Sequence, residues 1–249
     1  MNVGLYQSAA SLSALERWQE AVSQNITSSE ITAYKKRMTY FSGVDSGEFL
    51  VDPKARTGRG EGEPATFPMA HSAINFLAGE TKPTGRSLDV ALQSDGFFEV
   101  QMPDGTKAYT RAGEFRLQPD RTVVTGRGAK VMLASGTPLQ LTSGQGDLVI
   151  SQDGTVSQGT TQLGKLSIQT FTDPAQLTPL SAGFFLAPEG VDPQPATKPV
   201  VLQGNLESSN LTALHEMVDL VTISRAYEAN QKIISSRDEL LDKTLQAFG

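Results

Sequence analysis

The sequence predicts an α+β fold. Long N- and C-terminal α-helices would form a coiled-coil-like core domain, and the chain between them would form an all-β domain of antiparallel barrel or sandwich type. Three observations predict this arrangement. Apolar residues recur every seven positions near the C-terminus, apolar residues lie three, four and seven apart in the first thirty residues, and short alternating runs separated by Asp-Gly dipeptides fill the middle.

The N-terminal part, residues 1–34, begins with a helix predicted from residue 3 to about residue 29. Its apolar positions fall near one helical face: Leu5, Ala9, Leu12, Leu15, Val22 and Ile26. Trp18, the only tryptophan, is interpreted as an anchor in the core or between helices. Residues 35–84 keep no period for long and contain Asp52-Pro53 and glycines at 58, 60 and 62, which predicts an extended linker with room for one short strand.

The central part, residues 85–202, shows the pattern of β-structure. Residues 88–92 alternate, residues 97–102 are aromatic and β-branched, and Asp-Gly turns stand at 95–96, 104–105 and 153–154. Further strands are predicted near residues 108–117, 122–125, 129–133, 147–150, 155–157 and 163–171. Strands this short, at near-regular spacing, favour a barrel or sandwich.

The C-terminal part, residues 203–249, contains a second helix predicted from about residue 211 to residue 247, with Asn210 as its N-cap. Its apolar column has no break: Ala213, Leu220, Tyr227, Ile234, Leu241 and Phe248. The positions four residues after this column are polar in the middle: Met217, Ser224, Gln231, Asp238 and Leu245. This pattern disfavours a two-stranded zipper and favours a helix that packs against several neighbours with one wet side.

Composition excludes several classes of function. The formal charge of −6 argues against nucleic acid as the main partner, and the absence of cysteine excludes disulfides and cysteine-bound metals. The two histidines have no metal or triad spacing, and His215-Glu216 fails the zinc-protease pattern because residue 219 is Asp. No catalytic, cofactor-binding or metal site is predicted. One enzymatic alternative stays open, a secreted hydrolase with carboxylates gathered in a β-barrel cleft.

Motifs along nearly the whole chain resemble those of the bacterial flagellar rod and hook proteins. The C-terminal signature is carried by residues 203–210 (QGNLESSN), 216–218 (EMV) and 225–230 (RAYEAN). The N-terminal resemblance lies in residues 22–28 (VSQNITS) and 32–35 (TAYK), and the β-domain resemblance in residues 87–91 (SLDVA), 95–98 (DGFF) and 109–115 (YTRAGEF). One departure is Ala33, where the family has Gly. Because Ala resists a positive φ, the turn after the first helix is expected to differ.

The resemblance implies a structural subunit of the flagellar basal-body rod and not an enzyme. Such a subunit polymerises into a helical tube that transmits torque and surrounds an export channel. Its partners would be copies of itself, other axial proteins of the rod and hook, and the flagellar type III export apparatus, with no nucleic acid, membrane insertion or small-molecule substrate. Its location would be the basal body within the periplasm, reached without a cleaved signal peptide. A proximal-rod position is favoured over a distal-rod position. A hook subunit or another secreted fibre or adhesin subunit is the alternative.

The residues expected to form the assembly interface come from both predicted helices. Each could equally serve packing between the two helices of one chain. They are Leu5, Leu12, Leu15, Val22, Asn25, Leu220, Arg225, Tyr227, Ile234 and Leu241.

Overall fold

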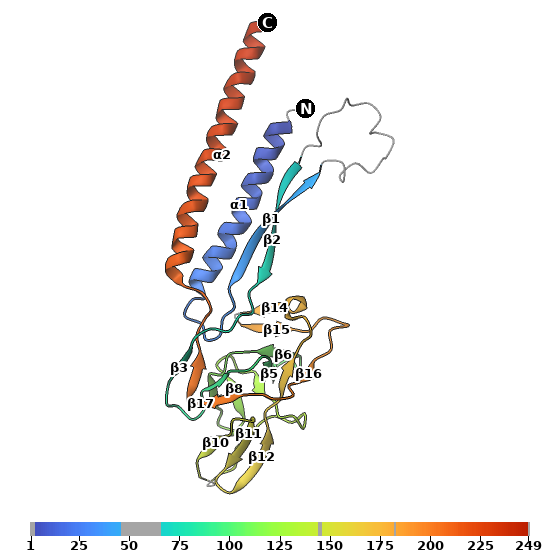
Figure 1. The fold of residues 1–249 in the computed structure, drawn as a ribbon, viewed down its shortest axis with the longest axis vertical. Helices are drawn as coiled ribbons and strands as arrows, with labels where there is room; N and C mark the ends of the chain where they lie inside the picture. The colour runs from blue at the N-terminus through green and yellow to red at the C-terminus, as the bar shows by residue number, and fades with distance from the viewer. Residues whose placement is uncertain (1–2, 46–65, 144–145, 182, 249) are drawn as a thin grey trace. The chain divides into compact units, whose positions relative to one another are not determined.

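The computed structural model describes residues 3–45, 66–143, 146–181 and 183–248. One α-helix lies at each end of this described chain, α1 (Val3–Thr27) and α2 (Ala213–Phe248), and strands occupy the sequence between them (Figure 1). The chain divides into two compact units. We call residues 1–27, 37–74 and 213–249 the helix unit, and residues 28–36 and 75–212 the β-unit.

The strands are short except for the first two. In chain order they are β1 (Arg37–Asp45), β2 (Thr66–Ile74), β3 (Thr81–Pro83), β4 (Val90–Leu92), β5 (Phe97–Gln101), β6 (Lys107–Thr110), β7 (Phe115–Leu117), β8 (Val123–Thr125), β9 (Lys130–Val131), β10 (Leu148–Ile150), β11 (Thr155–Gln158), β12 (Thr161–Lys165), β13 (Ile168–Thr170), β14 (Thr178–Ser181), β15 (Phe184–Leu186), β16 (Gln194–Pro195), β17 (Val201–Gln203) and β18 (Asn205–Glu207).

In the helix unit, α1 and α2 run antiparallel and share one apolar cluster (Figure 1). Leu15, Val22 and Ile223 are its buried members, and the partly buried residues around them are Trp18, Ile26, Leu220, Ala226 and Tyr227. The side chain of Arg237 lies against Gly4 at the far end of the pair. Within the described residues, neither helix is long and apolar enough to cross a membrane.

A β-hairpin completes the helix unit on the other side of α1. β1 and β2 pair antiparallel over nine residues each, with Arg37 opposite Ile74 and Asp45 opposite Thr66. Trp18 of α1 meets Phe41 edge-to-face at 5.7 Å, and Arg17 Nη1 donates to the Ala70 carbonyl at 3.4 Å. The sequence predicted an extended linker with room for one short strand in this segment. The structure instead has two nine-residue strands that pair with each other. The rest of that segment, residues 46–65, lies outside the described residues.

The β-unit is built on a branched sheet of nine strands. Its main path runs β14-β15-β6-β5-β9-β8-β7, and β13 joins it through β5 and carries β16. Smaller sheets are the three-stranded β10-β11-β12 and the pairs β17-β4 and β18-β3. The last two pairs place the chain leaving the β-unit beside the chain entering it.

Apolar side chains from both the branched sheet and the smaller sheets meet in one core. Phe98 and Phe115, each 1% exposed, meet edge-to-face at 5.4 Å within a cluster that also holds Val90, Leu139 and Val156. Two of the three Asp-Gly dipeptides are hairpin turns as predicted, between β5 and β6 and between β10 and β11. Asp95-Gly96 instead connects β4 and β5, which are not neighbours in a sheet.

The predicted fold class is wrong in both of its details. The two helices do not form a coiled-coil-like core domain, because only part of each contributes to the shared cluster and α1 also packs against the hairpin. The positions that would complete an apolar seam include Glu216, Asn230 and Arg237, so the seam is not continuous. The described central strands form a branched sheet and several small sheets, and they form no closed barrel. The four-part division of the chain at residues 34, 84 and 202 stays a prediction.

Candidate functional site

The ten predicted interface residues have different environments within the chain. Leu15, Val22 and Asn25 are buried, and Arg225 is exposed. Five are half-buried: Leu5, Leu12, Leu220, Tyr227 and Ile234. The side chain of Leu241 lies outside the described residues. The structure brings Leu15, Val22, Leu220 and Tyr227 into the cluster shared by α1 and α2, and it joins Asn25 to α2 through Glu216. The role of all ten residues between subunits stays a prediction.

Asn25 links three elements of the helix unit. Its Nδ2 donates to the Arg37 carbonyl and to Glu216 Oε2, both at 2.8 Å, and its Oδ1 accepts from the Arg37 backbone N–H at 2.9 Å. Both Asn25 and Glu216 are fully buried. The end of α1 is thereby joined to the start of β1 and to the first turn of α2.

The positions three and four residues after the apolar column of α2 differ in burial. Met217, Ser224, Gln231 and Asp238, four residues after the column, are all exposed. The positions three residues after it turn toward α1 instead: Glu216 and Ile223 are buried, and Asn230 and Arg237 are half-buried. Both spacings fall near the same face of a helix, so only the packing decides between them.

A second apolar face lies on α2, which we call the outer patch: Leu214, Met217, Val218 and Val221. Their side chains are 67%, 52%, 57% and 53% exposed, respectively. Spacings of three, four and seven place them on one face, and at 3.6 residues per turn this face is roughly opposite Ile223. Beyond Val221 the same face continues with Arg225, Glu228 and Lys232. A seven-residue repeat does not reveal the outer patch, because the patch spans only two turns of the helix.

The β1–β2 hairpin is also apolar on the side away from α1. Met38 is 42%, Tyr40 54% and Met69 39% exposed. Tyr40 stands opposite His71 in the register, and their rings stack at 5.1 Å. His71 also shares a 2.8 Å hydrogen bond with the Ser42 hydroxyl, so this histidine is a member of the hairpin surface.

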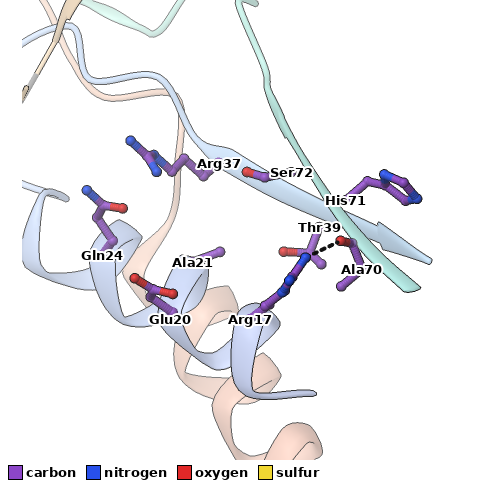
Figure 2. Close-up of a pocket in the computed structure, with 9 residues that line it drawn as sticks. All are labelled: Arg17, Glu20, Ala21, Gln24, Arg37, Thr39, Ala70, His71 and Ser72. Atoms are coloured by element: carbon purple, nitrogen blue, oxygen red, sulfur yellow. Dashed lines mark hydrogen bonds between the residues drawn. The ribbon is translucent and has the colours of Figure 1, made fainter. Parts of the chain in front are cut away.

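A pocket of about 260 Å³ lies between α1 and the hairpin (Figure 2). Its polar walls come from Arg17, Glu20 and Gln24 on α1 and from strand residues that include Arg37 and Thr39. Thr39 Oγ1 is buried and has no hydrogen-bond partner in the described structure. Guanidinium and hydroxyl donors suit a carboxylate or amide group. Across the described ranges, no cluster of three or more His, Asp or Glu could hold a metal.

The β-unit encloses three charged side chains, Lys35, Arg111 and Glu207, which we call the charge node. Glu207 Oε1 accepts from Lys35 Nζ at 2.6 Å, and Oε2 accepts from Arg111 Nε at 2.8 Å. The side chains of Lys35 and Glu207 are 0% and 1% exposed, and that of Arg111 is 5% exposed. Each comes from a different motif of the sequence, and no local pattern predicted that the three would meet.

Backbone groups complete the charge node. Lys35 Nζ also donates to the Leu77 carbonyl at 2.8 Å, and the Gly79 N–H donates to Glu207 Oε1 at 2.9 Å. Burial lowers the pKa of Lys35 from its usual value; attraction to Glu207 offsets part of this effect, and Arg111 adds to it. Charges taken out of water are costly unless every partner is present. The node therefore tolerates the loss of a member poorly.

Asn210 is not the N-cap of α2, which begins three residues later. Its Oδ1 accepts from the Lys36 N–H at 2.8 Å, and its Nδ2 donates to the carbonyls of Asn75 and Leu77 at 2.8 and 2.9 Å. The side chain thus joins three segments of the β-unit. A polar residue shortly before a helix is the sequence signal for an N-cap. That signal does not distinguish a residue that caps the helix from one that joins segments of the β-unit.

Ala33 adopts the conformation that was expected to be avoided. Its φ is 54°, its side chain is 1% exposed, and its N–H donates to the Glu207 carbonyl at 2.8 Å. The turn therefore keeps a left-handed residue although a Cβ is present. For a non-glycine residue this costs about 1–2 kcal/mol.

We expect Ala33→Gly to stabilise the β-unit. Relief of strain is partly offset by the greater freedom of Gly in the unfolded chain, which leaves a gain of about 0.5–1 kcal/mol. Urea unfolding, monitored by hydrogen exchange of the β-unit amides, measures this gain in stability. Ala91→Gly in β4 is the control and should lose stability, because Gly weakens a strand interior. A loss at position 33 as well would contradict the assignment of strain there.

Comparison with known proteins places this arrangement in a family. Residues 91–158 match the model of the flagellar hook protein FlgE/F/G D1 domain, and residues 202–247 match that of the flagellar basal body rod FlgEFG protein C-terminal region. The flagellar basal-body rod protein FlgG of Agrobacterium fabrum is 31% identical over 256 residues, covering 93% of this chain and 94% of that protein. This chain belongs to the flagellar basal-body rod protein family. It is a structural protein of the flagellar basal body, and not an enzyme.

Other relatives of this rod protein carry two names. FlgG of Borreliella burgdorferi is 28% identical over 95% of both chains, and FlgF of Rhizobium meliloti is 28% identical over 100% of this chain and 99% of its own. Membership in the family implies assembly with other rod and hook axial proteins. Because relatives of similar identity are named FlgG and FlgF, the preference for a proximal-rod position stays a prediction.

Proposed function

We propose that this rod subunit polymerises into a helical tube and that the outer patch of α2 is one of its contacts with neighbouring subunits. The observation that carries the proposal is that α2 is apolar on two nearly opposite faces. One face packs against α1, and the other leaves four large apolar side chains more than half exposed. A soluble helix normally shows one apolar stripe, and a contiguous exposed patch marks an interaction site.

The second surface of the proposed assembly is the outer side of the β1–β2 hairpin, with Met38, Tyr40 and Met69. A contact between two different patches of identical subunits adds copies head-to-tail, and it builds a filament where the rotation does not close. Among the predicted interface residues, Arg225 lies next to the outer patch. Tyr227 and Ile234 lie on the opposite face of α2. In such a tube the helices would surround the export channel and the subunits would transmit torque.

The route to this location is part of the same proposal. The chain would be delivered by the flagellar type III export apparatus without a cleaved signal peptide, and it would assemble in the periplasmic part of the basal body. The absence of cysteine fits a chain that needs no oxidation after delivery. The family relationship supports the axial partners.

Imaging of basal bodies from a strain that lacks this chain tests the proposal. We expect the rod and everything outside it to be missing, and a plasmid copy of the intact chain to restore them. The control is the same strain with an empty plasmid. Complete rods and hooks in the deletion strain would contradict the proposal.

A further inference from the structure

Residues 28–36 form a separate piece of the β-unit, which we call the strap. They follow α1 directly and precede the hairpin of the helix unit, yet they belong to the β-unit. Ala33, Tyr34 and Lys35 are all 5% exposed or less. The position of such a short segment depends on its contacts with the rest of the β-unit.

The strap is held mainly by the C-terminal end of the β-unit, while residues 75–77 supply two further hydrogen bonds, from the Asn75 N–H to the Lys36 carbonyl and from Lys35 Nζ to the Leu77 carbonyl. The Ala33 N–H donates to the Glu207 carbonyl at 2.8 Å, the Ser209 hydroxyl donates to the Tyr34 carbonyl at 3.3 Å, and the Lys36 N–H donates to Asn210 Oδ1 at 2.8 Å. Lys35 then reaches the carboxylate of Glu207, which lies 172 residues further along the chain. Most of the strap's hydrogen-bond partners therefore lie in the chain beyond residue 206.

Two features oppose the closed position of the strap. Ala33 is strained at a φ of 54°, and the charge node holds two cations against one carboxylate, with the pKa of Lys35 lowered by burial. An open groove of about 220 Å³ also runs along the strap. It is lined by Glu30, Ile31 and Thr32 on one side and by β-unit residues that include Glu114 and Phe184 on the other. Water therefore already reaches the part of the strap that lines this groove.

We propose that the charge node is a clamp: Glu207 fastens the strap to an already folded β-unit, and the strap opens and closes while the rest of that unit stays folded. Local opening of this kind is expected where a segment contributes nothing to the main apolar core of its unit. The nine-stranded sheet and its core receive none of their strands from the strap. Closing needs residues from both ends of the β-unit.

Hydrogen exchange of the full chain, followed by mass spectrometry, tests the clamp. In Lys35→Met, Glu207 keeps Arg111 and the Gly79 N–H, so the β-unit core retains its partners. We expect amides of residues 31–36 to exchange about a hundredfold faster, because a buried ion pair has lost one member. Amides of β5 and β6 should be unchanged. Lys107→Met is the matched control: it removes an exposed lysine, which is paired with Glu99 at 3.0 Å, and should leave the strap unchanged.

A second variant separates the clamp from a general loss of stability. Glu207→Gln removes the anion shared by both cations, so the strap should open at least as much as in Lys35→Met, and residues 92–96 should exchange faster because Arg111 holds their carbonyls. Exchange of the strap within threefold of wild type in Lys35→Met would overturn the proposal. Equal acceleration of the strap and of β5 and β6 in that variant would also overturn it, because the strap would then not be a separate unit.

Discussion

Arg111→Met is expected to lower the free energy of unfolding of the β-unit by about 3–5 kcal/mol, the range seen when one partner of a buried ion pair is removed. The guanidinium does more than pair with Glu207. Its Nη1 donates to the Gly96 carbonyl at 3.1 Å, and its Nη2 donates to the carbonyls of Leu92 and Ser94 at 3.0 and 3.1 Å. These three carbonyls lie in the turn between β4 and β5, and Met offers them no donor.

The measurement must report on the β-unit itself. Trp18, the only tryptophan, lies in the helix unit, so its fluorescence would miss the change. Hydrogen exchange of the β5 and β6 amides over a urea series reports it directly. Arg116→Met is the matched control: Arg116 pairs with Glu114 at 2.8 Å, its side chain is 61% exposed, and its loss should cost less than about 1 kcal/mol. An equally small loss for Arg111→Met would contradict the role given to the node.

The double variant Val218→Asp, Val221→Asp is expected to abolish rod assembly while the subunit stays folded. Both side chains are more than half exposed in the single chain, so the change removes little intramolecular packing. Surface substitutions of this kind usually alter stability by less than about 0.5 kcal/mol each. In a subunit contact the same carboxylates would be buried among apolar side chains without partners, which is strongly unfavourable.

Complementation of the deletion strain measures this effect. The variant should give no rods and no motility, while the purified chain keeps the circular dichroism of the wild type. Val149→Asp in β10 is the control, since it is the same substitution at a valine that is 49% exposed but lies in the β-unit. Normal rods with the double variant would show that the outer patch is not an assembly contact.

The sequence predicted the positions of the elements better than their packing. The repeats near both ends placed α1 and α2 within about two residues of their ends, because helical periodicity is a local signal. It could not choose between Met217 and Glu216 as the side that faces α1, because that choice depends on the partner. The coiled-coil-like core was inferred from the seven-residue apolar repeat of α2. The polar residues at 216, 230 and 237 interrupt the apolar seam that such a core needs.

Long-range contacts explain most of what was missed at the candidate site. Lys35, Arg111 and Glu207 stand in three quoted motifs, but contacts between residues far apart in the chain bring those motifs together, such as the hydrogen bond from the Ala33 N–H to the Glu207 carbonyl. Asn210 looked like a helix cap because its local neighbours permit one. Ala33 was expected to change the turn, yet the hydrogen bond from its N–H to Glu207 accompanies the strained φ.

The charge node also constrains how the sequence of this protein can evolve. Changing Glu207 leaves two buried cations without their carboxylate, and changing Lys35 or Arg111 removes one of the two ion pairs of Glu207. Three apolar side chains of similar volume, in contrast, can be as stable as a buried ionic cluster. Sequences with only one or two of the three residues replaced are therefore less stable than either the ionic cluster or the fully apolar one. We expect the three positions to change together or not at all, so that their replacement requires a coordinated set of mutations and not a stepwise path.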